Sequence, residues 1–234
     1  MKGGIEIPNL TDIDMIVFDV DGTLIDSQEM IYEALRLTLE HYSLKVPNRK
    51  KANSVIGLSV KESFKQLFPK LEEKMLQSVV TKCKETFSKI RLSQGSRNNC
   101  HLYSGVEKTL FNLSKRADLI LGIATGKPLN NLIEDLNYYK IKNYFSNLQT
   151  SDHHPSKPNP SMLRSALRQT GISSKKAIMV GDTKFDIEMA KAASIRSIGV
   201  SWGYHNPRVL KRIGPDRIID SFDQLERVID ELLG

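Results

Sequence analysis

Four short runs of apolar residues constrain the fold of this 234-residue chain more than any other feature. Each run is bounded by turn-forming residues, and the runs occupy positions 15–18, 119–124, 177–180 and 197–200, with a possible fifth at 217–220. Such short, continuously apolar runs are typical of strands that are buried on both faces, as in a parallel sheet. The sequence therefore predicts a parallel sheet as the core.

Helical patterns alternate with these runs in the second half of the chain. One pattern covers 106–113, a second begins with Pro160 as its first helical residue and ends at Gly171, and a third covers 186–193. Proline at the start and glycine just past the end are typical helix boundaries. Alternating strands and helices indicate βαβ units, so the expected fold class is α/β, with a Rossmann-like open parallel sheet.

The segment between the first and second apolar runs breaks this alternation. It contains only helical patterns, at 27–42, from the N-cap Ser59 to position 68, and after Pro69, followed by a polar return linker at 93–99. We therefore expect a helical cap domain inserted after the first strand. The expected division is core at 1–26, helical cap with linkers at 27–103, and core at 104–234.

Polar residues follow the predicted strands at the points where they end. Open α/β sheets place their sites at the carboxyl ends of the strands, so these residues should converge on one crevice. A lysine in a proline-rich loop at 155–160 is a further candidate, because the prolines stiffen the loop that carries it. The candidates are Asp19, Asp21, Thr125, Gly126, Lys157, Asp182 and Asp186.

Clustered carboxylates repel one another unless a cation neutralises them. A hard, oxygen-preferring Mg²⁺ fits such a set, with the side chains of Asp19 and Asp182 and the backbone carbonyl of Asp21 as ligands. The strand ends carry no His or Cys, which disfavours zinc and iron. With Mg²⁺ and Lys157 holding it ionised, Asp19 can attack phosphorus as a nucleophile.

The remaining candidates have predicted roles around this nucleophile. Thr125 and the N–H of Gly126 can hydrogen-bond phosphoryl oxygens at a helix N-terminus. Asp21 can protonate the leaving alcohol and then deprotonate water. Gly22 permits a sharp turn, and Thr23 can brace the loop through its hydroxyl.

The chain resembles a known superfamily through four motifs in their usual order. The motif DVDGTL at 19–24, Thr125, Lys157 and GDTKFD at 181–186 look like those of the haloacid dehalogenase superfamily. The helical insert resembles the cap of its phosphoglycolate phosphatase-like and β-phosphoglucomutase-like branch. The likeness covers nearly the whole chain.

The resemblance implies a role for each motif residue. It implies that Asp19 is the nucleophile, Asp21 the acid and base, and Asp182 a metal ligand. Thr125 and Lys157 would bind phosphate, and Asp186 would support the metal shell or hold Lys157. An acid at position 21 argues against dehalogenation, because a halide leaving group needs no proton donor.

The expected function is that of a Mg²⁺-dependent phosphatase that hydrolyses a small phosphate monoester, phosphoglycolate or similar, through an aspartyl-phosphate on Asp19. A phosphomutase of the β-phosphoglucomutase type and an inorganic pyrophosphatase remain alternatives, because these activities differ in the cap and in the exclusion of water. A remote alternative is a non-catalytic phosphate-sensing module like the response-regulator receiver, which is about half as long.

Charge and hydropathy narrow the expected partners to a small phosphate substrate. The net charge is +7, but basic residues are scattered among acids and their densest cluster is only 49–51, which disfavours nucleic acid. No apolar stretch approaches the roughly 18–20 residues that span a bilayer, and no signal peptide is visible at the start. With two cysteines, the expected location is a reducing cytoplasm, and no obligate protein partner is evident.

Three further features have a structural and a functional interpretation. His153 and His154 lie in a polar loop, where adjacent histidines are usually structural. Trp202 and Tyr204 are expected to be packing residues. The segment 57–59 lies where related caps approach the active site; it, and 49–51 before it, could contact substrate, although a simple turn and helix cap explains it equally well.

Overall fold

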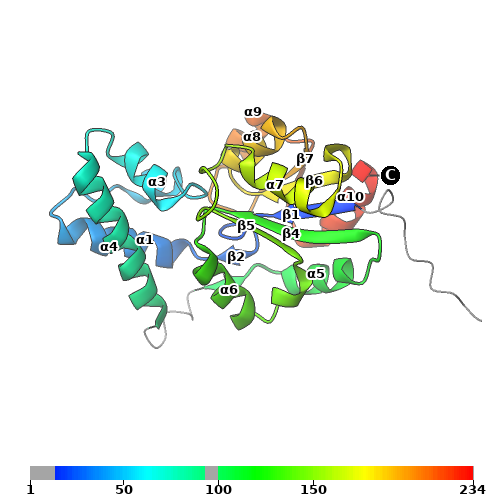
Figure 1. Cartoon of the computed structure of the whole chain (residues 1–234), viewed down its shortest axis with the longest axis horizontal. Coiled ribbons are helices and arrows are strands. Elements are labelled where there is room, and N and C mark those ends of the chain that lie inside the picture. Colours follow the sequence, from blue (N-terminus) through cyan, green and yellow to red (C-terminus); the bar gives the residue numbers. More distant parts are fainter. Residues whose placement is uncertain (1–13, 93–99, 234) are drawn as a thin grey trace, which may run out of the picture.

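A sheet of six parallel strands forms the core of the protein in the computed structural model, which describes residues 14–92 and 100–233 (Figure 1). Neighbouring strands follow the order β5-β4-β1-β6-β7-β8, and every pair is parallel. The predicted α/β class with an open parallel sheet is confirmed. The strands are β1 (Asp14–Phe18), β4 (Leu119–Thr125), β5 (Asn147–Thr150), β6 (Ala177–Gly181), β7 (Arg196–Val200) and β8 (Arg217–Ile219).

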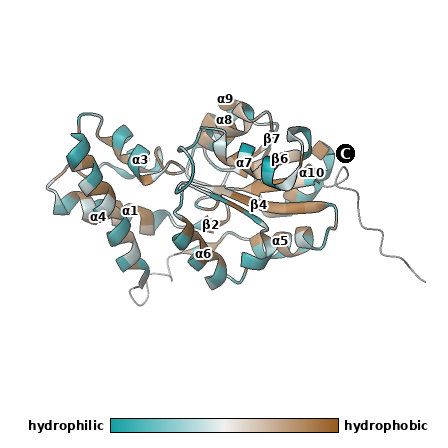
Figure 2. Ribbon diagram, in the orientation of Figure 1, coloured by the Kyte–Doolittle hydropathy of each residue, from teal (hydrophilic) through white to brown (hydrophobic). Residues whose placement is uncertain are grey.

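Helices cover both faces of this sheet. Alternate residues of β1 explain its continuous apolar sequence, because Ile16 and Phe18 belong to one apolar cluster while Met15 and Val17 belong to the other. Strand β4 is accordingly largely brown in Figure 2, whereas several helices show teal on one side. The first cluster includes α5 (Val106–Ser114), α6 (Leu129–Tyr138) and α10 (Leu225–Leu233), and the second includes α7 (Ser161–Thr170) and α8 (Lys184–Ala192), beside which α9 (Pro207–Ile213) packs.

Four helices lie to one side of the sheet and are here called the helical unit (Figure 1). They are α1 (Gln28–His41), α2 (Arg49–Asn53), α3 (Val60–Leu67) and α4 (Glu73–Leu92). The unit has an apolar cluster that includes Leu39, Phe64 and Val79. Helices are thus present where the sequence predicts them between the first two core strands, and Ser59 caps α3 by accepting a hydrogen bond from the Glu62 N–H.

The chain passes between the sheet and the helical unit through two segments that pair with each other. Strand β2 (Ile25–Asp26) runs antiparallel to β3 (His101–Leu102), with Ile25 opposite Leu102. The predicted return linker at 93–99 and the start of the chain at 1–13 lie outside the described residues. None of the helices in the described part is long and apolar enough to cross a membrane.

Several elements are absent from the sequence predictions. Strand β5 was not predicted, because it is an edge strand with polar side chains, Asn147 and Gln149, that are buried through hydrogen bonds to each other and to Gln169. Helices α2, α6, α9 and α10 were also not predicted. Helix α7 begins at Ser161, so Pro160 is its N-cap rather than its first residue. The fifth apolar run, at 217–220, contains strand β8, which covers Arg217–Ile219.

Candidate active site

A buried lysine joins two carboxylates at the end of β1. The Lys157 Nζ atom lies 2.9 Å from Asp19 Oδ1 and donates a 2.6 Å hydrogen bond to Asp186 Oδ1. All three side chains are buried. The other carboxylate oxygen of Asp186 accepts bonds of 3.0 and 2.7 Å from the N–H and hydroxyl of Thr183, which form a capping box at the start of α8. Asp186 therefore holds Lys157 with one oxygen and caps α8 with the other.

Asp182, at the end of β6, is fixed from two directions. Thr23 Oγ1 donates a 3.0 Å hydrogen bond to Asp182 Oδ1, and the Tyr204 N–H donates one of 2.8 Å to Oδ2. Gly22 has φ +86°, and a Cβ atom there would lie 2.3 Å from Asp182 Oδ2. Only glycine therefore allows this loop to approach the carboxylate so closely.

The oxygens of Asp19, Asp182 and Asp186 form a site that fits a divalent cation. One oxygen from each lies within 4.8 Å of the others. The buried Asp19 Oδ2 atom accepts no hydrogen bond from any residue between 14 and 92 or 100 and 233. Three carboxylates face the single ammonium of Lys157, and all donors are hard oxygens. Both oxygens of Asp186 are engaged by Lys157 and Thr183, and each oxygen of Asp182 accepts one hydrogen bond, so Asp19 Oδ2 is the carboxylate oxygen of this cluster that is left for a cation among the described residues.

The protonation of this cluster reflects its burial. Burial raises the pKa of Asp19 from its ordinary 3.8 to about 7, with the Lys157 ammonium opposing the rise and the Asp186 carboxylate adding to it. Burial also raises the pKa of Asp182 well above its ordinary value, and the negative charges of Asp186 and Asp19 add to this effect. A bound cation would favour the ionised form of both groups.

Asp21 belongs to a second series of ion-paired side chains in the site. Its Oδ1 atom accepts a 2.5 Å hydrogen bond from Ser27 Oγ and lies 2.9 Å from Lys127 Nζ. Lys127 also pairs with Asp135 of α6, and Asp135 accepts a 2.8 Å hydrogen bond from Arg91 of α4. Lys127 was not identified from the sequence. Its position two residues after Thr125 was the feature that could have indicated a place in the site.

Thr125 and Gly126 lie at the end of β4, directly against the helical unit. Thr125 Oγ1 accepts a 3.3 Å hydrogen bond from the Lys127 N–H, and α6 begins at Leu129. A Cβ atom on Gly126 would lie 2.6 Å from the carbonyl oxygen of Leu58. The loop before α3 therefore touches the predicted phosphate-binding residues. This agrees with the expectation that the segment 57–59 approaches the active site.

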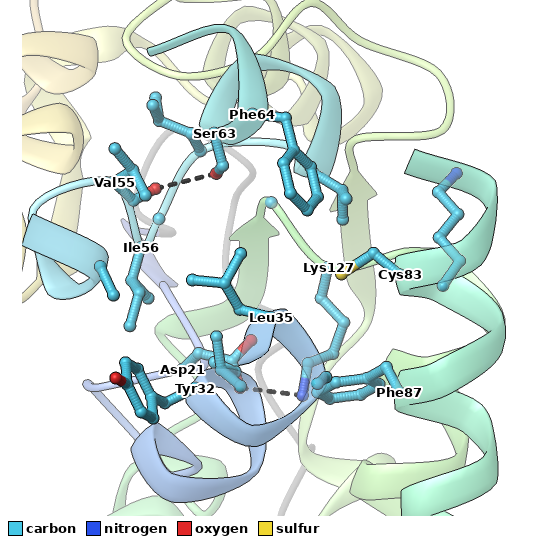
Figure 3. A pocket seen from close by; sticks show the side chains of 18 of the residues that line it. Asp21, Tyr32, Leu35, Val55, Ile56, Ser63, Phe64, Cys83, Phe87 and Lys127 are labelled. Carbon is cyan, nitrogen blue, oxygen red and sulfur yellow. Dashed lines mark hydrogen bonds and ion pairs between the residues drawn. The ribbon is translucent and has the colours of Figure 1, made fainter. Parts of the chain in front are cut away.

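A cavity lies between the carboxyl ends of the strands and the helical unit (Figure 3). Asp19, Asp21, Thr125 and Gly126 all line it. Lys157, Asp182 and Asp186 surround Asp19. The structure thus brings the seven candidate residues from four separate segments of the chain to one place, at the edge of the sheet that parallel topology favours for sites.

Other residues singled out in the sequence have structural contacts. His154 is hydrogen-bonded to Ser161 Oγ and Gln149 Oε1, at 2.8 and 2.9 Å. Arg49 pairs with Glu29 and does not line the cavity. Tyr204 does more than pack, because its backbone holds Asp182 and its hydroxyl accepts a 2.9 Å hydrogen bond from the backbone N–H at position 27.

Fold and site together define an α/β protein with a cluster of carboxylates at the carboxyl ends of its parallel strands. The chain belongs to the family of haloacid dehalogenase-like hydrolases, whose model matches residues 16–200. It is 29% identical over 228 residues to a phosphoglycolate phosphatase from Photobacterium profundum (93% of this chain, 96% of the relative). It is 32% identical over 214 residues to the pyrophosphatase PpaX from Bacillus velezensis (90% of this chain, 93% of the relative).

A solved structure supports the same assignment. The crystal structure of a predicted phosphatase from Clostridium acetobutylicum superposes with a TM-score of 0.83 at 28% identity, covering 94% of this chain and 99% of that one. The four motifs recognised in the sequence therefore identify the family correctly. The protein is an enzyme, a phosphatase of this family.

Proposed function

We propose that the protein is a Mg²⁺-dependent phosphatase that hydrolyses a small phosphate monoester through an aspartyl-phosphate on Asp19. The observation that carries the proposal is the position of the Asp19 carboxylate. One oxygen is paired with Lys157, and the other, Oδ2, has no hydrogen-bond donor among the described residues. This carboxylate also lines the cavity between the sheet and the helical unit.

In the first step, an oxygen of Asp19 attacks phosphorus as the bond between phosphorus and the ester oxygen breaks. Asp21 gives its proton to the leaving alcohol. In the second step, water attacks phosphorus, Asp21 takes a proton from that water, and the bond to Asp19 breaks to release inorganic phosphate. Lys157 and the donors of Thr125 and Gly126 stabilise the negative charge of the transferred group.

The metal site in this proposal uses the carboxylates of Asp19 and Asp182 and the backbone carbonyl of Asp21. When bound, Mg²⁺ would neutralise charge on the phosphoryl oxygens. In this proposal Gly22 turns the loop sharply and leaves space beside Asp182, Thr23 braces the loop through its hydrogen bond to Asp182, and Asp186 holds Lys157.

The helical unit acts as a cap in the same proposal. Residues 27–103 would form this cap with its linkers, and 1–26 and 104–234 would form the core. The β2–β3 pair joins the two crossing segments, and Arg91 of α4 bonds to Asp135 of α6 across the boundary. Such contacts allow a cap to close over bound substrate and exclude water.

Pyrophosphate hydrolysis is a second candidate, favoured by the likeness to the relative named pyrophosphatase PpaX. It would use the same nucleophile but a phosphate leaving group. Phosphoglycolate is the ester named for the Photobacterium profundum relative. A panel containing both compounds beside neutral esters separates these possibilities.

The test uses p-nitrophenyl phosphate with Mg²⁺ or EDTA, comparing wild type with Asp19→Asn and with Asp223→Asn, a control at an exposed carboxylate that does not line the cavity. Hydrolysis should require the metal, disappear in Asp19→Asn and persist in Asp223→Asn. Acid quenching with a radiolabelled ester should trap protein-bound phosphate only when Asp19 is present. Metal-independent hydrolysis, or label retained in Asp19→Asn, would contradict the mechanism.

A further inference from the structure

The cavity that begins at Asp19 and Asp21 extends into the helical unit between apolar side chains. The cavity has a volume of about 130 Å³, roughly ten times what one water molecule needs. A group larger than a few atoms therefore fits. The apolar lining includes Ile31, Leu35, Val55, Ile56, Phe64 and Phe87, several of which surround the space in Figure 3.

The polar side chains on these walls are mostly engaged within the protein. Ser63 Oγ donates a 3.1 Å hydrogen bond to the Val55 carbonyl, and the Tyr32 hydroxyl donates one of 3.2 Å to the carbonyl of Pro47. Lys127 is buried between two carboxylates, one of which is Asp21 (Figure 3). None of these groups is free to bind a second anion on the substrate.

The remaining polar groups of the lining do not form an anion site. Asn53 and Asn131 are uncharged, and Asn53 Oδ1 is a buried acceptor that no described residue satisfies. Among the described residues, the one further cation of the lining is Lys84, an exposed residue of α4, where water competes for its ammonium. A carboxylate or a second phosphate placed here would lose water without gaining a charged partner.

We propose that the substrates are phosphate monoesters of uncharged, mainly apolar alcohols, and that the cavity of the helical unit binds their alkyl or aryl group. This inference rests on the proposed phosphatase reaction at Asp19 and narrows its substrate class. The phosphoryl group occupies the charged end of the site, and the leaving alcohol projects from Asp21 toward Leu35 and Phe64. Each buried methylene should contribute about a fourfold gain in transition-state binding.

The first experiment compares kcat/KM for methyl, propyl and pentyl phosphate, 2-phosphoglycolate and pyrophosphate, with Mg²⁺ present. From methyl to propyl phosphate, kcat/KM should rise by about fourfold per methylene. Propyl phosphate should exceed 2-phosphoglycolate, its analogue of similar length with a carboxylate, by about tenfold or more. Flat values along the alkyl series, or a preference for either anionic compound, would overturn the inference.

The second experiment uses two leucines of α1 as a matched pair. Leu35 is 8% exposed and lines the cavity, whereas Leu37 is 37% exposed and does not. The ratio of kcat/KM for pentyl and methyl phosphate should fall about tenfold in Leu35→Ala and stay unchanged in Leu37→Ala. Because both rates come from one sample, this ratio does not depend on the folded fraction.

The outcomes separate this inference from the function on which it rests. Mg²⁺-dependent hydrolysis that favours 2-phosphoglycolate, and that loses this preference in Lys84→Ala, would overturn the apolar substrate class while leaving the phosphatase reaction intact. Equal ratios in Leu35→Ala and wild type would do the same. Absence of hydrolysis with p-nitrophenyl phosphate and every ester of the series would instead contradict the proposed function, and the inference with it.

Discussion

Lys127 Nζ lies 2.9 Å from Asp21 Oδ1, and the lysine side chain is almost completely buried. The same ammonium pairs with Asp135 of α6, which in turn bonds to Arg91 of the helical unit. Asp21 is therefore positioned by a series of ion pairs that begins at Arg91 in the helical unit. This arrangement makes Lys127 a positioning residue for the proposed acid and base.

Replacing Lys127 with Met should lower kcat for p-nitrophenyl phosphate by about 10- to 100-fold, part of the range typical of general acid–base catalysis. The neutral side chain fills similar space but leaves Asp21 and Asp135 without their shared cation. Lys211→Met, at an exposed position of α9, is the control and should retain wild-type kcat. A kcat in Lys127→Met within twofold of wild type would show that Asp21 needs no such support.

Gly22 and Gly171 have similar positive φ angles, but a side chain would collide with a neighbour only at Gly22. Substituting each with Ala therefore distinguishes the cost of backbone strain from the cost of a steric clash. Gly22 and Gly171 have φ of +86° and +75°, but a Cβ on Gly22 would collide with Asp182 whereas one on Gly171 meets nothing within 4 Å. Gly171→Ala should lose about 1 kcal/mol of unfolding free energy and keep its kcat. Gly22→Ala should lose at least 100-fold in kcat, in proportion to a displaced catalytic group.

Urea unfolding and steady-state kinetics on the same preparations would check this pair. If Gly22→Ala behaved like Gly171→Ala in both measurements, the close approach of the loop to Asp182 would have no catalytic importance. Loss of activity in both variants would instead indicate that the left-handed backbone angle, not the space, limits substitution.

The raised pKa of Asp19, about 7, gives a pH dependence with a definite sign. Because the folded-state pKa exceeds the ordinary 3.8, the metal-free fold is favoured by protonation, and this contribution is lost as pH rises from about 4 to about 7. Mg²⁺ requires the ionised carboxylate, so its stabilisation should grow over the same window.

Thermal unfolding at pH 5 and pH 8, with about 5 mM Mg²⁺ or with EDTA, would measure this linkage. Compared with EDTA, Mg²⁺ should raise the Tm by roughly several degrees at pH 8 and change it little at pH 5. Asp19→Asn removes the titrating group and a ligand, so its Tm should respond little to Mg²⁺ at either pH. An equal Mg²⁺ effect at both values in wild type would contradict the assignment.

Strand-end chemistry could be predicted from the sequence because parallel topology brings the carboxyl ends of strands to one edge, whatever the intervening chain does. This accounts for the placement of Asp19, Thr125 and Asp182. Strand β5 could not be predicted in this way, because Asn147 and Gln149 become compatible with burial only through side-chain hydrogen bonds.

The cavity and the second series of ion-paired side chains also depend on packing that one sequence does not reveal. Leu35 and Leu39 lie one helical turn apart on α1, yet only Leu35 lines the cavity while both belong to the cluster of the helical unit. Lys127 gains its importance from Asp135, eight residues later on α6, and from the approach of α4. Both features depend on the angles and positions at which the helices pack against one another. The spacing of apolar residues in the sequence predicts only which face of each helix is apolar.

The contact between Ser59 and Ser156 offers a test of cap opening. The Ser59 N–H donates a 2.8 Å hydrogen bond to Ser156 Oγ, so the two residues are in direct contact across the boundary between the helical unit and the core. In the variant Ser59→Cys/Ser156→Cys, oxidation should lock the helical unit onto the core and lower kcat at least about tenfold, with recovery on reduction. Burial raises the pKa of both native thiols, Cys83 and Cys100, to about 11, so they should compete little for the oxidant.

Comparing the oxidised and reduced forms of this one variant removes any direct effect of the two substitutions on the loop beside Lys157. Mass spectrometry should confirm complete crosslinking before turnover is measured. If the locked protein turned over p-nitrophenyl phosphate as fast as the reduced one, substrate would enter and product would leave without movement of the helical unit. The cap would then be a fixed wall of the site, and the Arg91–Asp135 contact would be permanent rather than broken in each cycle.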